Sequence, residues 1–101
     1  MGNYVFEAFN GNHAEGGSTH AIAQYTHAEG RGSTAEGRYS HAEGNVTIAG
    51  GAGSHSEGMF SKALGNRSHA EGERTLAYGT ASHAEGISVI AHGEYSHAEG
   101  Y

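Results

Sequence analysis

Residues 68–81 read SHAEGERTLAYGTA, and this fourteen-residue unit repeats along almost the whole chain. Its first half contains the block His-Ala-Glu-Gly, which returns every fourteen residues without a slip in register. The one imperfect copy is His55-Ser56-Glu57-Gly58. A fixed period of this kind indicates a stack of small structural units, so the repeat has to be interpreted before any other feature.

The composition narrows the class of protein. A chain of 101 residues forms one domain at most, and much of its hydrophobic fraction of 36% is alanine. Eighteen glycines without a three-residue period, and no proline, exclude collagen. The absence of cysteine excludes a disulfide framework and thiol chemistry. A net charge of -6 argues against nucleic acid as a partner. We also expect no membrane contact by this segment and no signal peptide in it, because no apolar run or charged-then-apolar leader is present.

The repeat has a half-period of seven residues. Each half reads Ser/Thr-x-Ala-x-Gly followed by two free residues. We call the equivalent positions of successive halves a column. Only Ser56 interrupts the Ala column and only Ala23 the Gly column, while Asn12 and Val89 depart from the Ser/Thr column. A coiled coil is excluded, because a glycine in every heptad costs about 1 kcal/mol relative to alanine. The recurrent apolar residue is also too small for a coiled-coil seam. Five residues of strand and two of turn fit better.

Strand alternation then predicts the fold. Ser/Thr, Ala and Gly share one face of each strand, and the two intervening residues share the other. We predict an all-β, stacked parallel β-roll with two short strands per 14-residue coil, small faces inward and glycine at the corners. Coils about 4.8 Å apart give a rod of roughly 30–35 Å. Residues 12–101 form the predicted seven-coil domain. Residues 1–11, with the large Tyr4, Phe6 and Phe9, are predicted to be an N-terminal cap strand.

The thin interior predicts an oligomer. Alanine packed on alanine buries little apolar area, and association supplies what one chain lacks. One outward face is uniform and the other is variable, and a uniform face suits a symmetry axis. We therefore predict that the interface is the ladder of His13, Glu15, His27, Glu29, His41, Glu43, His55, Glu57, His69, Glu71, His83, Glu85, His97 and Glu99. The alternative interface is the variable face, with Ile22, Ile48, Leu64, Leu76, Tyr78 and Ile90.

The pattern Ser-x-Ala-x-Gly-x-x-Ser/Thr-x-Ala-x-Gly resembles the head repeats, or Hep/Hag repeats, of YadA-like trimeric autotransporter adhesins. The resemblance covers roughly residues 12–100. It implies a homotrimer of left-handed parallel β-rolls on a bacterial cell surface that binds host surfaces or matrix proteins. Similar repeats in phage tail-fibre and appendage proteins imply a structural segment of a virion instead. The adhesin strand reads Ser-Val-Ala-Ile-Gly where residues 68–72 read Ser-His-Ala-Glu-Gly, so a polar interface replaces an apolar one.

Three roles are open for the ladder. The first is a polar network in which His of one chain meets Glu of the next and fixes the register. The second is metal binding by the His ladder, because imidazole and carboxylate suit Zn, Ni or Fe. The third is a pH switch in which Glu raises the pKa of His, so that the ladder is most stabilising at mildly acidic pH. We predict the network and no cofactor, with metal as the alternative. Seven equivalent copies do not make the single asymmetric constellation of an enzyme.

The free corner residues are the remaining candidates for function. Aromatic and arginine side chains contribute most of the energy at many interfaces. Possible surface contacts are Tyr25, Tyr39, Phe60, Arg67, Arg74 and Tyr95. The alternative is that these side chains pack on adjacent corners or on neighbouring chains.

Overall fold

The chain is a parallel β-solenoid. In the computed structural model, the described residues are 5–7 and 13–100. They form fourteen strands and no helix, and so contain no helix that is long and apolar enough to cross a membrane. The predicted all-β fold with stacked, parallel 14-residue coils is therefore confirmed.

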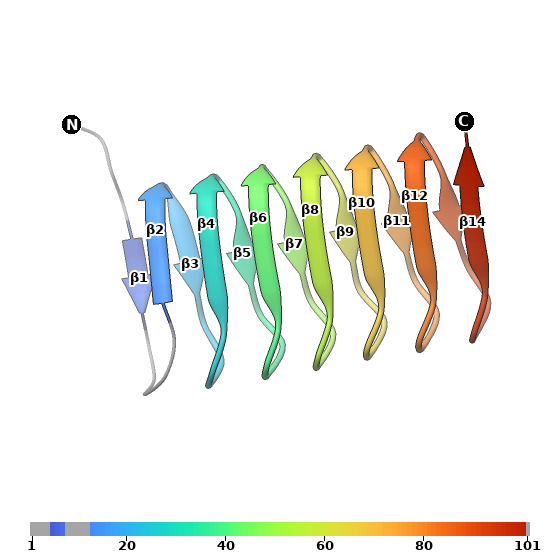
Figure 1. Cartoon of the computed structure of the whole chain (residues 1–101). Helices are drawn as coiled ribbons and strands as arrows, with labels where there is room; N and C mark the ends of the chain where they lie inside the picture. Colours follow the sequence, from blue (N-terminus) through green and yellow to red (C-terminus); the bar gives the residue numbers. More distant parts are fainter. Residues whose placement is uncertain (1–4, 8–12, 101) are drawn as a thin grey trace.

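Two seven-stranded parallel sheets make up the solenoid. Figure 1 shows the long strands in front and the short return strands behind. The long strands are β2 (His13–Gly17), β4 (His27–Arg31), β6 (His41–Asn45), β8 (His55–Met59), β10 (His69–Glu73), β12 (His83–Ile87) and β14 (His97–Gly100). The short strands are β1 (Val5–Glu7), β3 (Thr19–Ala21), β5 (Thr34–Ala35), β7 (Ile48–Ala49), β9 (Lys62–Ala63), β11 (Leu76–Ala77) and β13 (Ile90–Ala91).

The described strands make six complete coils, from β2 to β13, followed by β14. The predicted seven coils are thus half a coil too many for this part of the chain.

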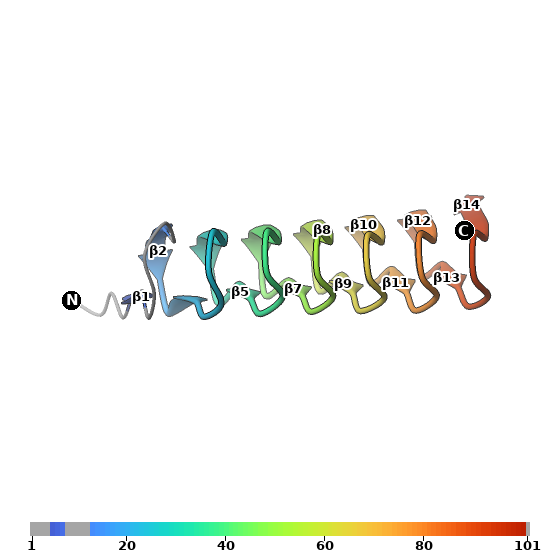
Figure 2. The same cartoon turned by 90° about the horizontal axis from the view of Figure 1, so that it is seen from below.

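The molecule measures 36 × 25 × 11 Å, close to the predicted rod length, and Figure 2 shows the two sheets as two thin rows. Strand β1 pairs in parallel with β3. Tyr4 and Phe9 lie outside the described residues, so the cap over residues 1–11 stays a prediction.

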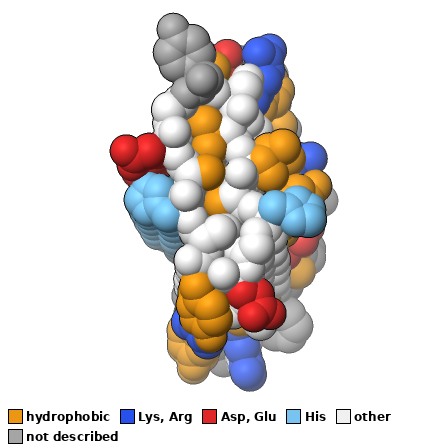
Figure 3. All heavy atoms as spheres, turned by 90° about the vertical axis from the view of Figure 1, so that its right-hand side faces the viewer, with side chains coloured by type: hydrophobic (Ala, Val, Ile, Leu, Met, Phe, Trp, Pro, Cys, Tyr) orange, Lys and Arg blue, Asp and Glu red, His pale blue; other side chains and the backbone are white. Residues whose placement is uncertain are grey.

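Alanine and small hydroxyl side chains fill the space between the sheets. From Ala21 to Ala84 every residue of the Ala column, including Ser56, is 0% exposed. The largest fully buried side chains in the described part are threonines and serines. Figure 3 looks along the solenoid and shows the hydrophobic column enclosed by backbone on both sides. The small face predicted to point inward does so, and Val89 is the largest apolar residue of the buried core.

Hydrogen bonds to turn carbonyls account for the hydroxyl group at most positions of the Ser/Thr column. The exceptions are Thr19, Ser40, Ser54 and Thr75, because their hydroxyls are buried without a hydrogen bond. After a long strand the hydroxyl donates to the carbonyl four residues back, as from Ser61 to Glu57 at 2.7 Å. After a short strand it donates three residues back, as from Ser68 to Gly65 at 2.6 Å. A buried carbonyl at a turn needs a donor, and each of these hydroxyls satisfies one without leaving the interior.

The corners differ from the prediction. The residues in the left-handed region are mostly not glycine: Ser18, Tyr25, Tyr39, Val46, Phe60, Arg67, Arg74, Ala81, Ser88 and Tyr95, with φ of 55–60°. The glycine column lies two residues earlier, where the backbones of neighbouring coils approach. A Cβ on Gly72 would lie 2.1 Å from the carbonyl oxygen of Gly86. Glycine is required there because the coils are in close contact and because the glycine of each long strand has a φ of 107–118°, which other residues rarely adopt.

Candidate functional site

The His/Glu ladder lies on the outward face of the long-strand sheet. In-register parallel pairing places each residue over its equivalent in the next coil, as with His69 and His83 or Glu71 and Glu85. Figure 3 shows the histidines as one column with the carboxylates beside it. From His27 to His83, successive imidazole centroids are 4.5–4.8 Å apart and the rings are within 7° of parallel. The structure thus brings all fourteen predicted ladder residues into one row of pairs.

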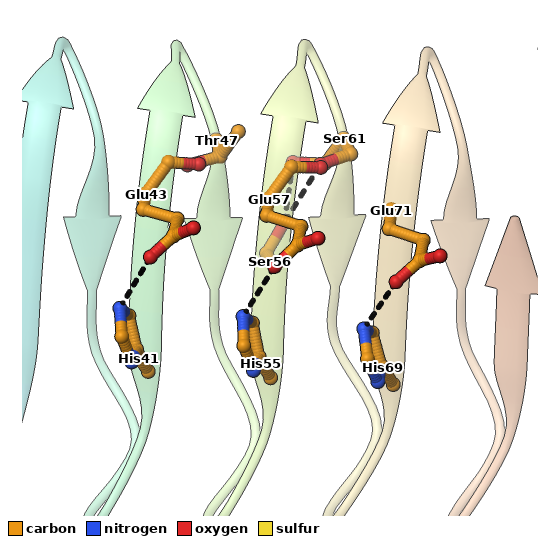
Figure 4. A network of polar contacts seen from close by, with 9 residues as sticks. All are labelled: His41, Glu43, Thr47, His55, Ser56, Glu57, Ser61, His69 and Glu71. Atoms are coloured by element: carbon orange, nitrogen blue, oxygen red, sulfur yellow. Dashed lines mark hydrogen bonds and ion pairs between the residues drawn. The ribbon is translucent and has the colours of Figure 1, made fainter.

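Each ladder histidine contacts the glutamate of its own strand. The distances from Nε2 to Oε1 are 2.7–2.9 Å in all seven pairs, three of which are drawn in Figure 4. This differs from the hypothesis that His of one chain meets Glu of the next. Residues two apart on a strand point to the same side, so the pair forms without a second chain.

The inner pairs are geometrically distinct from the outer ones. At His13, His27 and His97 the contact is a hydrogen bond. At the four inner pairs Nε2 lies 2.9 Å from the carboxylate, yet the contact lacks the alignment of a hydrogen bond and the nitrogen is buried; these histidines are His41, His55, His69 and His83. Stacking against both neighbours holds these rings nearly parallel, in an orientation that does not aim an N–H at the oxygen.

The pKa of His69, at the centre of the ladder, is shifted in the direction opposite to the one the pH switch requires. Burial lowers the pKa of His69, and the positive charges that His55 and His83 can carry lower it further. The neighbouring Glu71 and Glu57 oppose this shift but do not outweigh it. The glutamates do raise the pKa of His69 as predicted, but the predicted net rise is wrong, because burial and the neighbouring histidines lower the pKa by more. At the first coil, the hydrogen bond from His13 lowers the pKa of Glu15.

An open groove of about 430 Å³ runs along the carboxylate side of the ladder. Its lining combines the carboxylate row with the glycine column: Glu57, Glu71, Gly72, Glu85, Gly86, Glu99 and Gly100. The inner ladder side chains are 33–39% exposed. The ladder is therefore accessible in a single chain and is the most uniform feature of its surface.

The six corner candidates do not form one patch. Tyr25, Tyr39, Arg67 and Tyr95 follow the short strands, whereas Phe60 and Arg74 follow the long strands, on the opposite edge. The rings of Tyr25 and Tyr39 stack at 5.3 Å, which is the adjacent-corner packing that the sequence left as an alternative. Tyr95 is 76% exposed.

The sequence analysis missed a second hollow. It has a volume of about 370 Å³ and is lined by Phe60 and Arg74 together with Val46, Lys62 and Leu76. Val46, Phe60 and Arg74 occupy the same corner position in three successive coils, fourteen residues apart. The spacing of these three residues can be read from the sequence, and with strands stacked every fourteen residues it predicts that they lie side by side.

Comparisons with protein-family models, with curated proteins and with solved structures find no match to this chain. The resemblance of the repeat to YadA-like heads therefore stays a prediction. The function has to be argued from the solenoid, its two faces and its two corner edges.

Proposed function

We propose that the chain is a non-enzymatic structural module of a homotrimeric surface fibre, in which the His/Glu ladders of three chains face one another. The observation that carries the proposal is the interior. Most seven-residue half-coils bury one alanine and one small hydroxyl side chain. Such a coil gains little from the hydrophobic effect relative to the chain entropy that it loses, and association would bury more.

The regularity of the ladder supports its place at the axis. Its residues repeat in register over seven strands, so copies of the chain present identical rows at identical spacing. The opposite sheet has no such regularity. It carries large side chains that are 37–53% exposed, namely Ile22, Leu64, Tyr78 and Ile90. Burial of these apolar groups favours the opposite sheet as the alternative interface.

The outer edges would then be the adhesive part of the fibre. With three ladders facing inward, the exposed corners that carry Tyr39, Tyr95 and Phe60 would point away from the axis. Aromatic side chains in such positions suit contact with a host surface or matrix protein. The same arrangement serves a phage tail fibre, in which the segment would be mechanical and recognition would lie elsewhere.

Disulfide trapping tests the interface, because the chain contains no cysteine. Glu57→Cys places one thiol on the ladder and Leu64→Cys places one on the opposite sheet. For a ladder at the axis we expect Glu57→Cys to form disulfide-linked dimers on mild oxidation and Leu64→Cys to stay unlinked. The reverse result would move the interface to the apolar face. A monomer in sedimentation at micromolar concentration would contradict the trimer altogether.

Binding to cells or matrix-coated surfaces separates the two kinds of fibre. An adhesive head should bind as the intact trimer, and Tyr95→Ala should weaken the binding without changing sedimentation. A folded trimer that binds none of these surfaces would favour the mechanical role.

A further inference from the structure

We propose that the ladder binds divalent transition-metal ions of the zinc class in a row, with at most three ions per chain. Five overlapping triads carry the proposal: His27–Glu29–His41, His41–Glu43–His55, His55–Glu57–His69, His69–Glu71–His83 and His83–Glu85–His97. In each triad the two imidazole nitrogens and the carboxylate oxygen lie within 4.8 Å of one another. Two successive long strands supply each set, so one chain suffices.

The donor atoms select the class of ion. Two imidazoles and one carboxylate suit Zn²⁺, Ni²⁺ or Cu²⁺, whereas Ca²⁺ and Mg²⁺ require more oxygen ligands than a triad offers. Three protein ligands leave a fourth position of a tetrahedral ion open to water. The open groove beside Glu57, Glu71 and Glu85 gives an ion and its water access to the carboxylates of the third, fourth and fifth triads.

The ladder can adapt to an ion by tilting its rings. Zinc holds imidazole nitrogen at about 2.0–2.1 Å, so the two nitrogens of one tetrahedral site lie about 3.4 Å apart. Two stacked rings must therefore tilt toward each other. The ends of the ladder show that tilting is allowed, since His13 and His27 are inclined by 54° and His83 and His97 by 26°. At the inner pairs the ion would also displace only a contact that is not aligned as a hydrogen bond.

Sharing of histidines sets the stoichiometry. Consecutive triads have one histidine in common, and one Nε2 has a single lone pair to give to one ion. Neighbouring triads thus exclude each other, and tilting one pair together also moves each ring away from its other neighbour. The largest number of triads that share no histidine is three, namely the first, third and fifth, so three ions bind per chain. Glu43 and Glu71 then lie between occupied sites and offset the repulsion between ions.

Two double variants test this exclusion with equal numbers of histidines removed. His55→Gln with His69→Gln leaves the pairs His27–His41 and His83–His97, and so two ions. His27→Gln with His55→Gln leaves His69, His83 and His97 as neighbours, and so one ion because His83 is shared. The intact chain should bind three. The proposal does not rest on the trimer, since it needs the triads of one chain only.

The measurement is zinc per chain after chelator treatment, titration with Zn²⁺ and gel filtration, with circular dichroism as a check that each variant is folded. Co²⁺ absorption in the visible range reports nitrogen and oxygen ligation in the same samples. Ratios of three, two and one support the proposal. Equal zinc content in the two double variants, one ion for each of the seven His–Glu pairs, or no retained zinc in the intact chain would overturn it. Sedimentation of the same samples keeps this result separate from the disulfide test of the trimer.

Discussion

A methyl group placed between two coils tests whether the solenoid is close-packed. Gly79 and Gly93 occupy the same position in successive coils, and neither has a left-handed φ. A Cβ on Gly79 would lie 2.2 Å from the carbonyl oxygen of Gly93 and 2.8 Å from the amide nitrogen of Glu94. A Cβ on Gly93 would meet no described atom within 4 Å. Gly93→Ala is therefore a matched control for Gly79→Ala, because only the covering coil differs.

The magnitude follows from the coil spacing. Relief of the clash at residue 79 requires a shift of about 1 Å in a backbone held by neighbouring bonds, from Tyr78 N to Ala91 O at 2.9 Å and from Tyr95 N to Thr80 O at 2.8 Å. Weakening these two bonds costs about 1 kcal/mol each, and overpacking adds about 1–3 kcal/mol. We expect Gly79→Ala to lower the free energy of unfolding by about 3–5 kcal/mol. Gly93→Ala should change it by less than about 1 kcal/mol.

Urea unfolding followed by circular dichroism, at one fixed chain concentration, measures both variants. A fixed concentration is required because association changes the apparent stability. The midpoint should fall for Gly79→Ala and stay near that of the parent for Gly93→Ala, with similar slopes. If the two variants agreed within about 1 kcal/mol, the coils would be opening to admit a methyl group, and close contact could not be the reason for the glycine column.

Three further perturbations address the corner, the interior and the ladder. Val46→Asn should raise the free energy of unfolding by about 0.5–1 kcal/mol in the same urea assay, because a β-branched residue is strained at φ 56 and asparagine tolerates that region; a loss of stability would contradict the strain. Ser56→Ala should change it by less than about 1 kcal/mol, since alanine fills this position in the other coils. The lowered pKa of His69 makes the unfolded chain bind more protons, so the Tm of metal-free protein should fall as pH drops from 7.5 to 5. His69→Gln should reduce that fall, and a higher Tm at pH 5 would refute the sign.

The interior and the ladder were predictable because both depend only on the repeat and on strand alternation. The inward Ala column and the shared side of each His and Glu follow from side chains that alternate along a strand. The pH response was not predicted correctly, because the prediction considered a single strand, in which Glu71 is the charged neighbour of His69. The largest cause of the lowered pKa is burial in the stacked structure, and the next two, the charges of His55 and His83, come from residues fourteen positions away on either side.

The corners were mispredicted for a different reason. Local propensity assigns left-handed positions to glycine, yet Val46 and Phe60 occupy them. Hydrogen bonds between coils hold these corners, from Val46 N to Arg31 O at 2.7 Å and from Phe60 N to Asn45 O at 2.9 Å. Such bonds recur in every coil, so stacking outweighs a cost of about 1–2 kcal/mol per residue. The glycines that follow the short strands, such as Gly79, are required where backbones touch, which only the stacked structure reveals. Those of the long strands, such as Gly72, combine this close contact with a positive φ.

The charge of the ladder links the proposed trimer to the proposed metal sites. With neutral histidines the ladder is a row of seven carboxylates, and three such rows around one axis repel one another. Identical chains cannot supply the missing positive charge from their ladders, whereas zinc bound in the triads would. We therefore expect zinc to increase the trimer fraction of the unmodified chain in sedimentation and a chelator to decrease it, if the ladder is the interface. If the chains associate through the apolar sheet, zinc should not change the trimer fraction. That result, together with bound zinc, would support the metal sites and contradict a ladder at the trimer axis.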